Sequence, residues 1–275
     1  MRPYATAAFV FIDQWRIARH TSTMPFFTPK PPITKDEFDW LIACFAWLRA
    51  VLDDRGITPE FVLPGHPMLA ESRTANELFE AVKVLAGMEQ WPCRLEKVAD
   101  DFDPGDIRIQ PEGSSACGTF SVEGGEAVIR YSDSMLQKPD ALTATFAHEL
   151  CHYLLCNAGD PPGGPDLMEH STDCAAAYIG FGVFLANGAR EFAQFNDGEW
   201  SGWRASTTGY LSEQARVTAT ALFADLHGHD LSAAQAALKP YLQKDLRKAV
   251  KAVRHAHPDV SQSLDRVDLL DWNYG

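Results

Sequence analysis

The stretch that most constrains the fold of this chain is Ala147-His148-Glu149-Leu150-Cys151-His152, which reads H-E-x-x-H inside a longer apolar run. Residues four apart lie on one face of an α-helix, about 6 Å apart along its axis. The imidazoles of His148 and His152 can therefore reach one zinc ion. Glu149 lies near the same face, where it is suited to take a proton from a zinc-activated water as general base. The pattern predicts the metal-binding helix of a hydrolase.

The flanking sequence gives this helix a context. Residues 118–122 and 127–132 read as two β-strands joined by the Gly-rich connection 123–126, which is a hairpin signal. The helix is expected to open at Pro139, because proline is favoured in a first helical turn. Residues 157–165 are rich in Pro and Gly and predict a loop. A second helix is expected to begin near Asp166.

This order of elements, ending in a second helix with the pattern E-x-x-x-D at Glu169 and Asp173, resembles the gluzincin branch of zinc metallopeptidases. The resemblance covers roughly residues 106–190. It implies a zincin-like core in which Glu169 is the third zinc ligand beside His148 and His152. It further implies that Asp173 accepts a hydrogen bond from the other ring nitrogen of His148. The strand Ala127–Tyr131 would then be an edge strand that aligns an extended peptide.

Several of these residues also admit a plainer interpretation. Asp166 and Glu169 fit a capping box, in which Glu169 would fold back onto the helix start and not reach a metal. His170 is a rival ligand, and Asp173 could be an ordinary acid on the helix surface. Cys151 lies inside the motif, but its direction along the helix points it away from the metal face. We expect it to be a small buried thiol.

Hydrolysis also needs a group that stabilises the oxyanion formed when water attacks a carbonyl. In proteins of this fold the donor usually lies downstream of the third ligand, where Tyr210, Arg204, His227 and His229 are available. We favour Tyr210 as this catalytic residue, because it follows a glycine at a predicted junction of loop and helix. The alternative is a packed tyrosine at a helix start.

Composition narrows the class of protein. The 275 residues carry a formal net charge of −13, which argues against a nucleic-acid partner. Six cysteines show no C-x-x-C pairing, so they are expected to be reduced thiols of a cytoplasmic protein. The N-terminal apolar run 7–12 ends at Asp13 and is too short for most signal peptides. No stretch approaches the length of a membrane span.

The rest of the chain reads as mainly helical. An apolar helix is expected from Asp36 to about Asp53 with Thr34 as its cap, and a second near 74–87. An acidic, turn-rich segment at 100–106 suggests a boundary between a helical region, 1–104, and a zincin-like domain, 105–275. Within the second part, helices are predicted to end at Asn187-Gly188 and to cover 210–226, 232–238 and 241–255. Residues 56–70 are expected to form a loop.

The sequence therefore predicts a helix-rich α+β protein with one Zn²⁺ per chain that hydrolyses peptide bonds in a peptide or protein substrate. Glu149 would be the general base at a zinc-activated water. The alternative is a zincin-fold protein that binds zinc but is catalytically silent and acts in interaction or regulation. A third reading, a helix that is purely structural, would require the protein to bind no metal.

Overall fold

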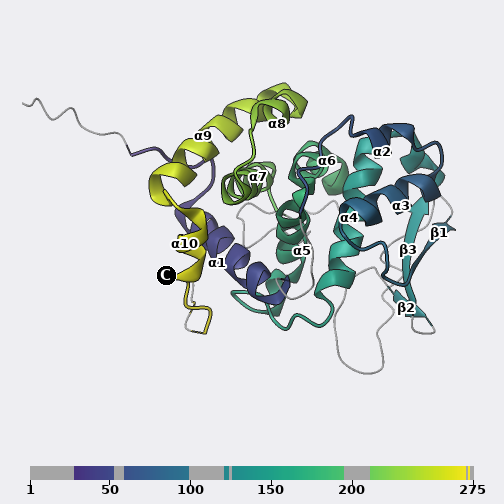
Figure 1. The fold of residues 1–275 in the computed structure, drawn as a ribbon, viewed down its shortest axis with the longest axis horizontal. Coiled ribbons are helices and arrows are strands. Elements are labelled where there is room, and N and C mark those ends of the chain that lie inside the picture. Colours follow the sequence, from purple (N-terminus) through teal and green to yellow (C-terminus); the bar gives the residue numbers. More distant parts are fainter. Residues whose placement is uncertain are drawn as a thin grey trace, which may run out of the picture.

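The computed structural model describes residues 28–52, 59–98, 121–123, 126–194, 211–270 and 272. These residues form a helix-rich α+β structure with a small sheet at one side (Figure 1). The helices are α1 (Lys35–Leu52), α2 (Pro67–Glu71), α3 (Ala75–Leu85), α4 (Pro139–Leu155), α5 (Met168–Ala176), α6 (Gly182–Gln194), α7 (Glu213–His227), α8 (Ser232–Ala237), α9 (Pro240–Ala256) and α10 (Val260–Asp265). Short 3₁₀ helices cover Asp133–Gln137 and Pro165–Leu167.

The sheet has the strand order β1-β3-β2, formed by β1 (Cys93–Val98), β2 (Ser121–Glu123) and β3 (Glu126–Ser132). The predicted hairpin is confirmed, because β2 pairs with β3 in antiparallel register. The prediction that Ala127–Tyr131 forms an edge strand is wrong. β1 pairs in parallel along the other side of β3 and places it in the middle. The sequence does not predict β1, because its Arg, Glu and Lys side chains hide the apolar alternation of a strand.

The N-terminal helices follow local signals. Thr34 Oγ1 accepts a hydrogen bond from the backbone N–H of Glu37 at 3.2 Å, as the predicted cap of α1 requires. At the start of α3, Thr74 and Glu77 form a reciprocal capping box. The stretch 56–70 is not wholly a loop, since the short helix α2 begins at Pro67, a favoured first position.

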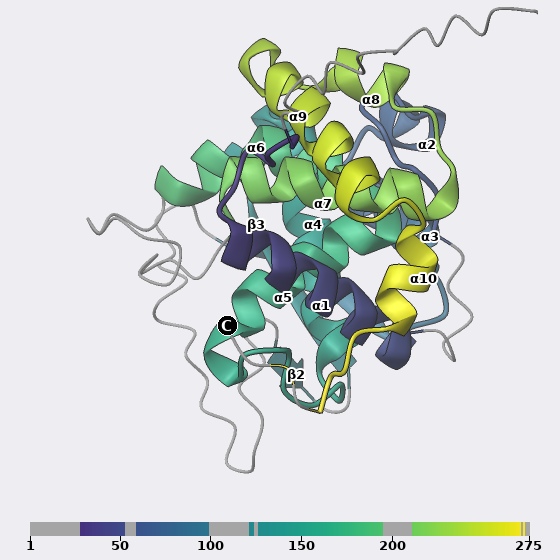
Figure 2. The same cartoon turned by 90° about the vertical axis from the view of Figure 1, so that its left-hand side faces the viewer.

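Helix α5 lies at the centre of the molecule. It contacts α1, α4, α6 and α7, and Figures 1 and 2 show these helices around it. Helix α4 bridges α5 and the sheet, because it also contacts α3 and β3. Its side chains Phe146, Leu150 and Leu154 are fully buried. Each such side chain contributes roughly 1.5–3 kcal/mol by leaving water, so α4 is held rigidly in the core.

The chain between α5 and α6 makes a π-helical turn, Ala177–Phe181, in which Gly180 has a φ of 100°. The predicted single helix is therefore kinked, and α6 runs on through Asn187 and Gly188 to Gln194, so the predicted C-terminal cap at these two residues is wrong. The Asn187 side chain instead bonds Ala237 and Lys239 at the α8–α9 junction. The small residues that follow α5 allow close helix packing, and at Gly182 the close neighbour is Thr220 of α7.

The C-terminal helices match their predicted ranges closely. α7 packs against α9 and α6, with Ser212 as N-cap and Gly228, in the left-handed conformation, as C-cap. Pro240 separates α8 from α9 and stands in the first turn of α9, as predicted. Among the described helices, not one combines the length and apolar character that a transmembrane segment needs. The proposed boundary near residue 104 lies outside the described residues.

Candidate metal centre

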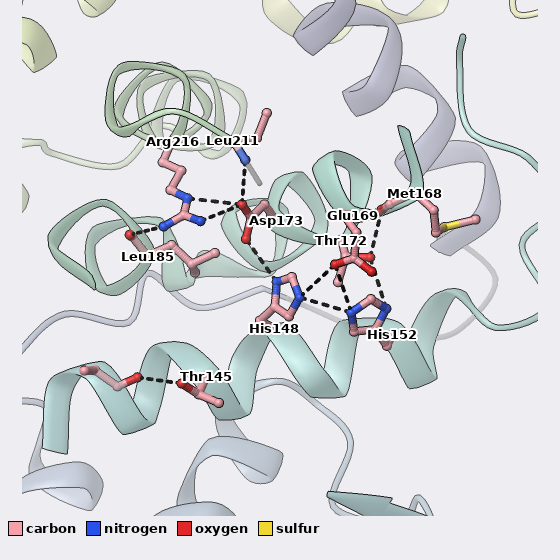
Figure 3. Close-up of polar contacts among 11 residues, drawn as sticks. Thr145, His148, His152, Met168, Glu169, Thr172, Asp173, Leu185, Leu211 and Arg216 are labelled. Atoms are coloured by element: carbon pink, nitrogen blue, oxygen red, sulfur yellow. Dashed lines mark hydrogen bonds and ion pairs between the residues drawn. The ribbon is translucent and has the colours of Figure 1, made fainter. Parts of the chain in front are cut away.

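Two helices bring the predicted ligands together. His148 and His152 lie one turn apart on α4 and face α5, from which Glu169 extends toward both rings (Figure 3). The two Nε2 atoms are 3.0 Å apart, and each lies 3.4 Å from Glu169 Oε2. Both imidazoles are buried, whereas the Glu169 side chain is 35% exposed. Of the three side chains in the cluster, only the carboxylate of Glu169 is therefore accessible to solvent.

The separations of these three atoms match those of metal ligands. Ligands held at 2.0–2.1 Å by a tetrahedral zinc ion lie about 3.3 Å from one another. The observed distances of 3.0, 3.4 and 3.4 Å are close to that value. The residues thus form a His/His/Glu group able to hold a metal ion.

The hydrogen bonds of the two Nδ1 atoms indicate which nitrogen of each ring carries a hydrogen. His148 Nδ1 is 3.0 Å from Asp173 Oδ1, and an ionised carboxylate only accepts, so this nitrogen carries a hydrogen. Thr172 Oγ1 donates to the carbonyl of Met168 at 2.9 Å and is left to accept from His152 Nδ1 at 3.4 Å. Both Nε2 atoms therefore present lone pairs to each other. That arrangement is stable only with a proton or a cation between them.

Asp173, at 1% exposure, joins the ligand helix to α7. Its Oδ2 accepts from Arg216 Nη2 at 2.8 Å, from Arg216 Nε at 3.1 Å and from the backbone N–H of Leu211 at 2.9 Å. The remaining guanidinium nitrogen, Nη1, donates to the carbonyl of Leu185 on α6 at 2.9 Å. Asp173 is therefore not a surface acid. It lies between the buried Arg216 and His148 (Figure 3). Its hydrogen bond with His148 is the one that the family resemblance implies.

The charges around the cluster favour a cation. Burial lowers the pKa of His148, but hydrogen bonds to Asp173 and Glu169 and the charge of Glu149 outweigh it and raise that pKa to about 10. Burial raises the pKa of Glu169, yet the two imidazoles hold it well below its usual range. With both imidazoles neutral, as metal ligands must be, the carboxylates of Glu149, Glu169 and Asp173 against the one guanidinium of Arg216 leave two negative charges. A divalent cation would balance them.

Glu149 lies on the accessible side of α4. It is half-buried, as are Thr145 and Tyr153 one turn before and after it, whereas the ligand face of the helix is fully buried. Its charge acts on His148 through space. This position beside the ligands, within reach of water, is the one that the H-E-x-x-H pattern predicts for a general base.

The structure decides three of the plainer interpretations, which concern the capping box, His170 and Cys151. Asp166 lies in a 3₁₀ turn, and Leu167, the N-cap of α5, provides no side-chain cap, so the capping box with Glu169 does not form. His170 points elsewhere: it is buried and packs edge-on against Trp40, with ring centroids 6.2 Å apart. Cys151 is fully buried in the core, as predicted, and burial raises the pKa of its thiol.

The oxyanion donor stays a prediction. Tyr210 and Arg204 lie outside the described residues. His227 and His229 stand at the C-terminal end of α7 and pack against Phe223. Arg216, which bonds Asp173 beside the cluster, is three turns before His227 on the same helix, so His227 lies about 16 Å further along it and His229 follows the helix end. They do not belong to the His/His/Glu group.

Sequence reasoning missed Arg216 and Thr172 as members of the site. For Arg216 a signal existed: it is the only charged residue in the otherwise apolar and hydroxyl-bearing stretch 215–224 of a predicted helix. A charge in such a stretch is buried and requires a partner. Thr172 carries no comparable signal, because its hydroxyl is placed only by the packing of α5 on α4.

Comparison of the chain with protein-family models, with curated proteins and with solved structures gave no match. The site is therefore interpreted from its own geometry.

Proposed function

We propose that the chain is a zinc metallopeptidase with a zincin-like core, which hydrolyses peptide bonds with Glu149 as general base. The observation that carries the proposal is the triangle of His148 Nε2, His152 Nε2 and Glu169 Oε2, with sides of 3.0, 3.4 and 3.4 Å. Two imidazoles and one carboxylate are a donor set typical of catalytic zinc. Oxygen-preferring ions such as Mg²⁺ and Ca²⁺ favour carboxylate, carbonyl and water ligands instead.

The side chains around the triangle have separate tasks in this proposal. Asp173 and Thr172 hold the outer nitrogens of His148 and His152, so that both Nε2 lone pairs face inward. A zinc ion bound there would lower the pKa of water and polarise a carbonyl. Glu149, half-exposed next to His148, would receive the proton of the attacking water and pass it to the leaving amine.

Zinc content tests the site. Elemental analysis of the wild type is expected to find about one zinc per chain, because three ligands converge on one point. His148→Ala is expected to lose it, and Glu169→Ala to retain it only weakly. Wild-type protein that stays free of zinc after incubation with the metal would contradict the proposal and leave the motif as helix packing.

Peptide hydrolysis tests the reaction. Screening the zinc-loaded wild type against a peptide library is expected to yield cleaved products. Glu149→Gln is expected to keep its zinc and lose cleavage by roughly 10²–10⁴-fold, the usual contribution of a general base. Zinc binding with no cleavage by the wild type would identify a catalytically silent zinc protein instead. A Glu149→Gln variant with full activity would exclude the mechanism.

A further inference from the structure

We infer that Arg216 is a positioning residue of the metal centre, which acts through Asp173 to fix the orientation of the His148 ring. The inference rests on the metal-binding part of the proposed function and not on peptide hydrolysis. Arg216 bonds Asp173 and the carbonyl of Leu185, and it lies on α7, a helix separated by more than 35 residues from the ligand helix α5.

The guanidinium of Arg216 is held in one orientation. Arg216 is 1% exposed, and its three nitrogens all donate: Nε and Nη2 to one oxygen of Asp173, and Nη1 to the carbonyl of Leu185. The planar group is thereby fixed between α5 and α6. A lysine ammonium has the same charge but lacks this planar fork, so it cannot reproduce the three contacts.

The two oxygens of Asp173 have different partners. The terminal torsion of an aspartate is soft and has no strong preferred angle. Three donors converge on Oδ2, two from Arg216 and one from the N–H of Leu211, and they set this torsion. Oδ1 is then directed at His148 Nδ1, at 3.0 Å. The orientation of the imidazole, and with it the direction of Nε2, follows from where α7 holds the carboxylate.

A positioning role of Arg216 differs from that of a plain ion pair between helices. An ion pair that only joins α5 to α7 would need Asp173 and Arg216 alone. Here the same carboxylate has its second oxygen on a ligand histidine, so any displacement of Arg216 is transmitted to the metal centre. Contacts of this kind to the ligands of a metal typically change its affinity by roughly 10–100-fold.

The experiment measures zinc affinity by competition with a chromophoric chelator, which does not depend on any catalytic activity. Arg216→Lys is expected to bind zinc about 10–100-fold more weakly than the wild type. Arg254→Gln is the control. Like Arg216, Arg254 pairs with an aspartate of another helix, Asp225 of α7 at 3.0 Å, but Arg254 is exposed and is not bonded to Asp173. It is expected to bind zinc like the wild type. A wild-type affinity in folded Arg216→Lys would overturn the inference.

A double-mutant cycle identifies the route. If Arg216 acts through Asp173, Asp173→Asn and the double variant Asp173→Asn/Arg216→Gln are expected to bind zinc equally weakly. Additive losses would overturn the inference, because Arg216 would then act by another path. Circular dichroism of each variant shows whether it is folded. Should Arg216→Gln not fold, the visible spectrum of Co²⁺ bound to Arg216→Lys replaces the cycle: a spectrum unlike the wild type is expected, and an identical one contradicts the inference.

Discussion

Glu37 and Ser212 join the first turn of α1 to the N-cap of α7: the Ser212 hydroxyl donates to Glu37 Oε1 at 3.3 Å. Glu37 is 5% exposed, so its carboxylate is largely shielded from water. Because Ser212 directly follows Leu211, whose N–H bonds Asp173, this contact helps place the start of α7 beside the metal centre.

The buried Glu37 predicts a pH dependence of stability. Burial raises the pKa of Glu37 above its ordinary value of 4.5, and this outweighs the hydrogen bonds from Ser212 and Thr34. The folded state thus binds its proton more tightly than the unfolded state, and the carboxylate destabilises the fold at pH values above the folded pKa. That penalty shrinks as the pH falls through the folded pKa and is absent below about 4.5.

Glu37→Gln is therefore expected to raise the free energy of unfolding at pH 8 and to have little effect at pH 4. Urea denaturation at both pH values measures the difference. Asp36→Asn is the matched control, because Asp36 is a neighbouring acid of the same helical turn but is exposed. It is expected to cost a few tenths of a kcal/mol at pH 8 through the helix dipole. Destabilisation of Glu37→Gln at pH 8 would contradict the prediction.

The π-helical turn predicts a large effect at Gly180. A Cβ on Gly180 would stand 1.8 Å from the carbonyl oxygen of Glu60, and its φ of +100° strains any other residue. The same glycine accepts a hydrogen bond from Val62 at 3.2 Å, so the segment before α2 is anchored there. Gly180→Ala is expected to lower the free energy of unfolding by about 3 kcal/mol or more, from strain and overpacking together.

Gly159→Ala separates the two causes. Gly159 also has a positive φ, +75°, but nothing lies within 4 Å of a Cβ built there. Its substitution is expected to cost only about 1 kcal/mol, the conformational part. Chemical denaturation of both variants gives the comparison. Equal losses would mean that the Glu60 carbonyl yields without cost, contrary to the expectation.

Much of this fold could be predicted because its signals are local. The H-E-x-x-H spacing, the Pro139 start of α4 and the Pro240 break each act within one or two turns, and the structure has all three. The strand β1 could not be predicted, because its pairing depends on β3, more than 25 residues away. A strand's place in a sheet is a property of such distant partners.

At the candidate site, too, local contacts could be predicted and contacts between distant residues could not. His148 and His152 are brought together by helical periodicity alone. Glu169 needed the family resemblance to be chosen over His170, since no local rule decides which of two adjacent side chains faces α4. The contact of Arg216 with Asp173 spans 43 positions, so it depends on how α7 packs against α5. It could have been inferred only as a buried charge in need of a partner.

Metal removal is predicted to destabilise the fold. The cluster joins α4 to α5 at the centre of the core, so a zinc ion held by all three side chains would bind the folded state more tightly than the unfolded chain. With free zinc at 1,000 times Kd, the wild type is expected to gain about 4 kcal/mol in free energy of unfolding. Denaturation with zinc and with a chelator measures this gain. His152→Ala is expected to show none, and an equal gain in that variant would place the zinc elsewhere.

The last prediction concerns Thr172, which holds the second ligand ring. Thr172→Val keeps the shape of the side chain but removes the hydroxyl that accepts from His152 Nδ1 at 3.4 Å. The buried ring nitrogen then loses its acceptor, and the ring is less firmly oriented. Because this contact is longer than the 3.0 Å bond from His148 to Asp173, we expect zinc affinity to fall by about tenfold or less.

Thr145→Val is the control for this substitution. Thr145 is a half-buried threonine of α4 whose hydroxyl donates to the carbonyl of Ala141 at 3.1 Å and makes no bond to the cluster. Chelator competition is expected to give it a wild-type zinc affinity. If Thr172→Val also binds zinc like the wild type, His152 is oriented by packing alone. If both variants lose affinity equally, the effect comes from the helices and not from the hydrogen bond to the ring.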